Sequence, residues 1–144
     1  MKDFIEQQIM RAVRELLAGR VNELLQDLLL HIPLIEFGEY CGNGSVVPVT
    51  TLSTCERSEK ERIIRQDAYS LTIAFELPEM PDGDLYCYAY SAAIEKAIGE
   101  NRTLGGIADR AVITGKKFNP PKKLHCGEGW DLVLSLRVVI EVRQ

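Results

Sequence analysis

The chain has 144 residues, a formal net charge of −4 and a sequence pI near 5.3. Hydrophobic residues make up 46% and charged residues 26%, which is ordinary for a soluble globular protein. The acidic balance argues against a dedicated nucleic-acid-binding protein, and the polar N-terminus is not typical of a secretory signal. The most apolar run, residues 24–35, is interrupted by polar residues and a proline, so we expect no membrane span. We expect one domain over residues 1–144, stable without disulfide or metal.

The N-terminal part, residues 1–31, is predicted to be a helical segment ahead of a sheet-and-helix core over residues 32–144. Apolar residues recur at spacings of three, four and seven between Ile5 and Leu28, as one face of an amphipathic helix requires. Gly19 lies near the middle of this pattern. It is either tolerated inside one helix at a cost of about 1 kcal/mol, or it ends one helix and allows a second to begin at Arg20 or Asn22; we prefer two helices.

Two short strands are expected next. Residues 34–40 and 46–52 are predicted to pair as a hairpin across a Gly-Asn-Gly-Ser turn, because glycine and asparagine tolerate positive φ. Pro48 in the second of these strands suggests a position at a sheet edge.

A charged stretch follows, with three acids and three bases in residues 56–62. It is either a solvated loop or a contact arm. An arm would be an extended hairpin tip or part of one long strand over residues 62–77. Its candidate contact residues are Arg57, Glu59, Lys60, Glu61 and Arg62.

The clearest structural signal is a strict apolar alternation in two places, residues 68–77 and residues 132–142. A period of two over that length predicts strands with one buried face. Between them we expect a helix over residues 84–99, which begins with acids that favour the helix dipole, and a strand over residues 110–115. The predicted fold is therefore α+β: a mixed, largely antiparallel sheet with a helix packed on one face.

A long connection over residues 115–129 is rich in lysine and proline. Loops of this length inside a compact domain are uncommon and often functional. It is either plain solvated surface or a cationic contact for an acidic partner or for passing DNA. Its candidate contact residues are Lys116, Lys117, Lys122 and Lys123.

No reactive constellation stands out. The cysteines include no C-x-x-C pair, so we expect four free thiols in a reducing cytoplasm. Gly115-Lys116 lacks the other residues of a phosphate loop. A catalytic thiolate at His125-Cys126 would need a base from elsewhere in the fold, and the only other histidine is His31. We expect no catalytic, cofactor-binding or metal-binding residue, and no enzyme activity.

The order of these elements resembles the tail terminator proteins of tailed bacteriophages, also called tail-completion proteins. The resemblance is best over residues 69–142. It rests on Leu-Thr-Ile-Ala-Phe-Glu-Leu at residues 71–77, on Asn-Arg-Thr-Leu-Gly-Gly-Ile-Ala-Asp at residues 101–109, and on Trp-Asp-Leu-Val-Leu-Ser-Leu-Arg at residues 130–137. The N-terminal segment is longer than the minimal family fold, so it could pack on its own sheet or reach a neighbouring subunit.

The resemblance implies a structural virion protein, encoded by a prophage where it occurs in a bacterial genome. Such a protein forms a hexameric ring that caps the tail tube, joins it to the head connector and acts first in the host bacterial cytoplasm, then in the virion tail. Its expected partners are its own copies, the tail-tube protein and the head-connector protein, with DNA passing through the lumen. Two alternatives remain: another phage neck or head-tail joining protein, and a small enzyme or ligand-binding protein with a site at residues 115–129.

Overall fold

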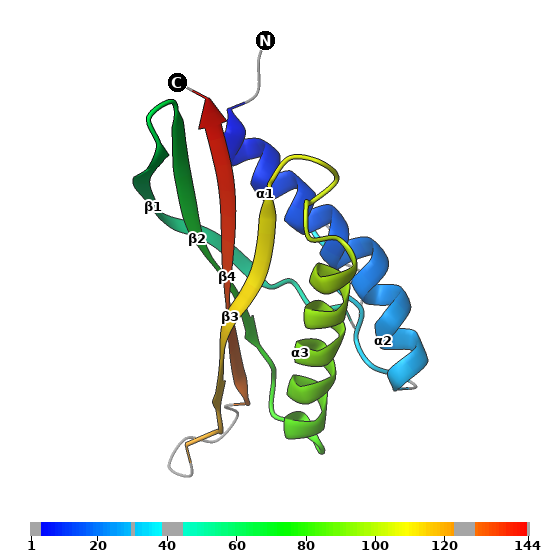
Figure 1. The fold of residues 1–144 in the computed structure, drawn as a ribbon. Helices are drawn as coiled ribbons and strands as arrows, with labels where there is room; N and C mark the ends of the chain where they lie inside the picture. The colour runs from blue at the N-terminus through cyan, green and yellow to red at the C-terminus, as the bar shows by residue number, and fades with distance from the viewer. Residues whose placement is uncertain (1–3, 30, 39–44, 123–128, 144) are drawn as a thin grey trace.

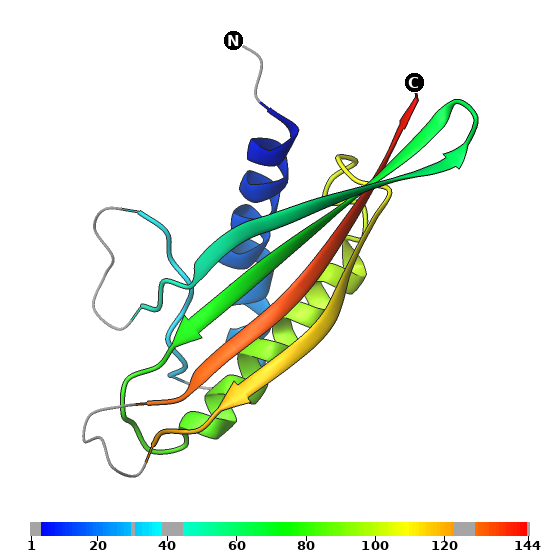
Figure 2. The same cartoon turned by 90° about the vertical axis from the view of Figure 1, so that its left-hand side faces the viewer.

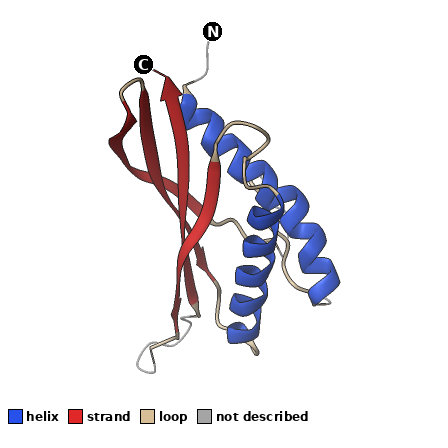
Figure 3. Ribbon diagram, viewed as in Figure 1, coloured by secondary structure: helices blue, strands red, loops and turns tan. Residues whose placement is uncertain are grey.

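A computed structural model describes residues 4–29, 31–38, 45–122 and 129–143. It has two layers: a four-stranded sheet, and helices that all lie on one face of it (Figures 1 and 3). This confirms the α+β fold class and the helix packed on one sheet face. In chain order the elements are α1 (Ile5–Leu16), a π-helical turn η1 (Leu17–Val21), α2 (Asn22–Leu28), β1 (Val49–Glu61), β2 (Ile64–Glu76), α3 (Gly83–Glu100), β3 (Arg110–Asn119) and β4 (Asp131–Arg143).

The sheet has the strand order β1-β2-β4-β3, and every neighbouring pair is antiparallel. The two alternating segments form its central strands, β2 and β4, paired in continuous register from Ile64 with Arg143 to Glu76 with Asp131. The alternation marks the buried face as predicted, with side chains buried on the helix side at Tyr69, Leu71, Ile73, Phe75, Leu132, Leu134, Leu136 and Val138. In the part of the chain that the structure describes, no helix lies on the opposite face, which is usual for an antiparallel sheet (Figure 2).

Helix α3 supplies the centre of the core. Tyr90 is fully buried and its ring stacks on Phe75 of β2, with 4.9 Å between the ring centroids. Its hydroxyl donates a 2.6 Å hydrogen bond to the Pro33 carbonyl, so α3 also holds the chain that leaves α2. Asp82 precedes the helix with φ of 60° and makes no side-chain hydrogen bond to it, while Asp84 is the acid in its first turn.

The prediction of two separate N-terminal helices was wrong. The backbone stays helical through Gly19, which lies in the π-helical turn, and Leu17 and Asn22 on either side keep right-handed helical φ and ψ. A π turn absorbs an extra residue inside a helix without ending it. The segment packs on its own subunit, because its buried residues Ile9, Val13, Leu17, Val21, Leu24 and Leu25 belong to the same cluster as the sheet residues.

The hairpin predicted over residues 34–52 was also wrong. Ile35 and Val46 form an isolated parallel bridge, whereas a hairpin requires antiparallel strands. The side chain of Asn22 holds this segment in place by accepting from the Ile35 N–H and donating to the Ile35 carbonyl, each at 2.8 Å. The following residues continue into β1 at Val49 and pair with β2 instead, so the edge position that Pro48 suggested is confirmed for the strand it precedes.

The connection over residues 115–129 is shorter than predicted, because β3 continues to Asn119. Gly129 lies beside the end of β2, where a Cβ would lie 1.7 Å from the Leu77 carbonyl oxygen. Only glycine allows these two backbone segments to approach each other this closely. The neighbouring backbone bond, from the Leu77 N–H to the Trp130 carbonyl at 2.9 Å, fixes the start of β4 against the end of β2.

Candidate assembly interface

The most exposed part of the sheet is the outer half of the β1–β2 hairpin, residues 53–67, which we call the arm. Every β1 side chain from Ser53 to Glu61 is exposed, although the strand alternates its side chains between two faces. Neither face of this half-strand is therefore covered by its own subunit, and Figure 2 shows the hairpin extending past the helices. The charged stretch therefore belongs to an extended hairpin and not to a loop, while its role in contacts stays a prediction.

Asp67 anchors the base of the arm. Its side chain is 5% exposed and accepts from Arg65 at 3.0 and 3.2 Å, while Arg57 on β1 lies 3.5 Å away. Hydrogen bonds between ionised groups are stronger than neutral ones, but Arg65 and Asp67 both lie on β2, so only the weaker Arg57 pair links the two strands. Sequence analysis singled out Arg57 but missed Asp67, whose only signal was an acid within an alternating strand.

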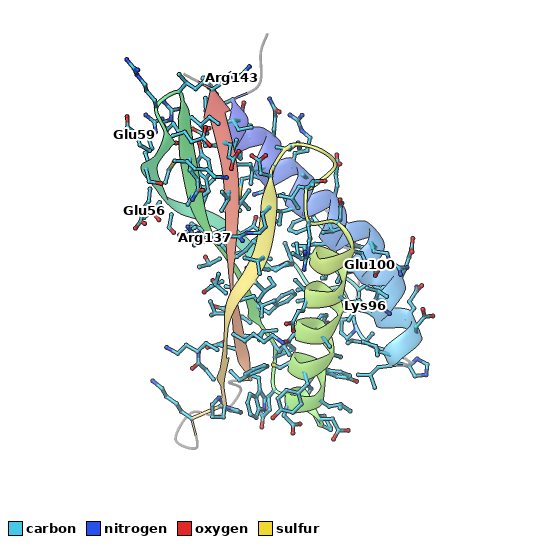
Figure 4. The ribbon with its side chains drawn as sticks, in the orientation of Figure 1. Glu56, Glu59, Lys96, Glu100, Arg137 and Arg143 are labelled. Atoms are coloured by element: carbon cyan, nitrogen blue, oxygen red, sulfur yellow. The ribbon has the colours of Figure 1, made fainter. Side chains whose placement is uncertain are left out.

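The other predicted arm residues lie further toward the tip. Lys60 pairs with Glu141 of β4, and this partner raises the pKa of Lys60. Glu59 lies opposite Arg65 and Glu61 opposite Ile64, and Arg62 occupies the turn. The carboxylates of Glu56 and Glu59 extend from the arm into solvent (Figure 4). The arm thus carries both acidic and basic side chains on the surface that a partner would contact.

The lysines of the predicted basic connection do not lie on one face of the protein. Lys116 lies on the helix side of β3 and pairs with Glu95 of α3, whereas Lys117 is exposed on the face without helices. Lys122 is exposed just beyond β3, and Lys123 lies outside the described residues. These lysines are therefore not one continuous loop surface, because Lys116 is engaged within its own subunit.

A groove opens at the end of the sheet opposite the arm tip, and we call it the edge groove. It has a volume of about 560 Å³ and is mostly apolar, lined by Pro33, Ser45, Val46, Val47, Val49, Ala74, Glu76, Leu77, Pro78 and Met80. It exists because β1 begins at Val49, opposite Ala74, and leaves the last residues of β2 without a β1 neighbour. Sequence analysis did not find this groove, since its lining comes from separated segments.

The thiols that the structure describes show no activated environment. Cys55 is exposed and Cys87 is buried in the core, and both are free. Burial raises the pKa of the Cys87 thiol to about 11, so it stays protonated at neutral pH. Burial, and then the neighbouring Cys55, raise the pKa of Tyr69 to about 12. The candidate pair at His125-Cys126 lies outside the described residues.

Within those same residues, no three histidine, cysteine or acidic side chains come together as a metal site. No helix in the described part of the chain is long and apolar enough to cross a membrane. Comparison with protein-family models and with curated proteins finds no match to this chain.

Proposed function

We propose that this chain is a non-enzymatic virion assembly protein that closes the tail tube of a bacteriophage as a ring, as the resemblance in its sequence implies. The arm is the observation that carries this proposal. A half-strand exposed on both faces contributes little to its own core, so its value to the protein lies in contacts with other chains.

The sheet supports the same proposal. Within the described residues, the outer strands β1 and β3 each have an unpaired edge, and one whole face of the sheet carries no helix. The face without helices suits contacts between copies or with a tube subunit, whereas the charged edges discourage direct strand pairing. A chain that meets its next copy through two different surfaces makes a bounded ring when the rotation closes, and a filament when it does not.

In this mechanism the protein acts by surface matching. One ring face pairs with the last ring of tail-tube protein, and the other face meets the head-connector protein while blocking further tube addition. The charged arm steers association, because exposed charges raise encounter rates more than final affinity. Assembly takes place in the host bacterial cytoplasm, and the ring then remains in the virion tail around the path of the DNA.

The test is deletion of the coding sequence from the phage genome that carries it, with tails measured by electron microscopy. We expect tails of uncontrolled length, and restoration of uniform length when the chain is supplied from a plasmid. Uniform tails that fail to join heads would instead identify a neck or joining protein. Normal particles and full titre after deletion would refute an assembly role.

A further inference from the structure

The tip of the arm carries an apolar side chain that its own subunit does not cover. Ile63 is 50% exposed in the two-residue turn between Glu61 and Ile64, next to the exposed cation Arg62. Turn positions usually carry polar or glycine residues, and an isoleucine at a projecting tip leaves apolar surface in water. This surface is therefore available to another chain.

The edge groove has the complementary chemistry. Val47 and Val49 are 47% and 64% exposed at its mouth, so an apolar side chain that enters would cover them. Glu76 lines the same groove and is exposed. Among the residues described, no ion-pair partner is observed for Glu76 or for Arg62. An apolar tip beside a cation thus matches an apolar groove beside a carboxylate.

The tip cannot reach the groove of its own subunit. They lie at the two ends of β2, and at about 3.3 Å per residue the strand from Ile64 to Glu76 spans roughly 40 Å. Figure 2 shows the hairpin tip and the end of β2 at opposite ends of the sheet. Any contact between the two is therefore a contact between different copies.

We propose that the arm tip of each copy docks in the edge groove of the next copy, with Ile63 entering between Val47 and Val49 and Arg62 pairing with Glu76. This inference rests on the proposed ring and names its subunit contact. Because the two surfaces differ and lie far apart, each copy can give one contact and receive one. Such a head-to-tail arrangement closes into a ring when its rotation closes, and the proposed function requires that closure.

The first experiment measures native mass of the full chain at increasing concentration, for the wild type and for Ile63→Asp and Val47→Asp. Both positions are half exposed, so an aspartate there leaves the core intact. We expect the wild type to form discrete higher oligomers and each variant to remain monomeric. Leu28→Asp is the matched control, since Leu28 is 53% exposed at the end of α2 and lines neither the groove nor the arm tip, so this variant should assemble like the wild type.

Mixing the two defective variants gives the sharper result. The Ile63→Asp copy retains a working groove and the Val47→Asp copy retains a working tip, so each pair can make one contact. We expect a 1:1 heterodimer that does not grow further. A charge exchange adds a second measurement: Arg62→Glu and Glu76→Arg should each weaken assembly alone and restore it when mixed, because every mixed contact then joins opposite charges.

Three outcomes would overturn the docking. The wild type could remain monomeric at its highest soluble concentration. Either aspartate variant could assemble normally, which would show that the ring forms through other contacts and that the groove binds a small apolar ligand or another protein instead. The Leu28→Asp control could lose assembly as well, which would show a nonspecific charge effect. The deletion phenotype judges the proposed tail function separately, so the two failures are distinguishable.

Discussion

Asp67 should stabilise the base of the arm mainly through Arg65 and only weakly through Arg57. Arg65 is 30% exposed and bonds both carboxylate oxygens, whereas Arg57 is 63% exposed and lies 3.5 Å away. A partly buried hydrogen bond between charged groups contributes about 1.5–3 kcal/mol, while an exposed ion pair contributes about 0–1 kcal/mol. We expect Arg65→Met to lower the free energy of unfolding by about 2 kcal/mol and Arg57→Met by less than about 1 kcal/mol.

Urea unfolding followed by circular dichroism measures both losses, with methionine retaining most of the aliphatic length of arginine. A double-mutant cycle with Asp67→Asn isolates each pair, and contacting residues of this kind couple by about 0.5–3 kcal/mol. The Arg57 pair should weaken in high salt more than the Arg65 pair, because exposed charges are screened more strongly. Equal losses for the two arginines, or no coupling between Arg65 and Asp67, would refute this reasoning.

Two further substitutions test the packing of the core. Tyr90→Phe removes the hydroxyl that donates to the Pro33 carbonyl, so urea or thermal unfolding should show a free energy of unfolding lower by about 1–3 kcal/mol. The matched change Tyr88→Phe, at a half-exposed tyrosine, should alter the free energy of unfolding by less than about 0.5 kcal/mol. Equal effects at the two tyrosines would contradict the buried hydrogen bond. Gly129→Ala should unfold the chain or destabilise it severely because its Cβ would overlap a carbonyl oxygen, while Gly99→Ala has open space in α3 and should stabilise it by up to about 1 kcal/mol. A folded Gly129→Ala variant of normal stability would show that the close approach is not required.

The sheet was predictable where burial dictates the sequence. On β2 and β4 each second side chain must be apolar to pack against the helices, and that constraint leaves a period of two in the sequence. Helix α3 was predictable within a residue or two at each end for the same reason, since acids, a buried stripe and Gly99 mark its course.

Strand pairing outside the core is not marked by an apolar alternation in the sequence. The outer half of β1 is held by backbone hydrogen bonds to β2, which are independent of side-chain identity, so its charged residues are equally compatible with a loop. The end of β3 is similar, because Lys116 and Lys117 alternate across the strand without an apolar pattern. In both segments the sequence shows charged residues, but it does not show that the backbone pairs with a neighbouring strand.

Tertiary contacts decided the remaining differences. The parallel bridge between Ile35 and Val46 depends on a side-chain amide from Asn22, thirteen residues earlier than Ile35, which no local turn propensity reports. The helix continues past Gly19 because buried neighbours on both sides of it hold the same face against the core, which outweighs the modest cost of a helical glycine. The edge groove depends on where β1 begins, and that boundary was misplaced with the hairpin.

The charges on the sheet edges explain why the proposed subunit contact uses the ends of the strands. An exposed edge strand invites unlimited pairing with other chains unless charges along it make misaligned pairing costly. Arg57, Glu59 and Lys60 on β1, and Lys117 on β3, interrupt both edges in this way. Contact through a single apolar tip and a single groove avoids that problem, because each is filled once and neither can extend along the strand. To stop at one ring, this head-to-tail contact also needs a rotation that closes, since without closure it too would build a filament.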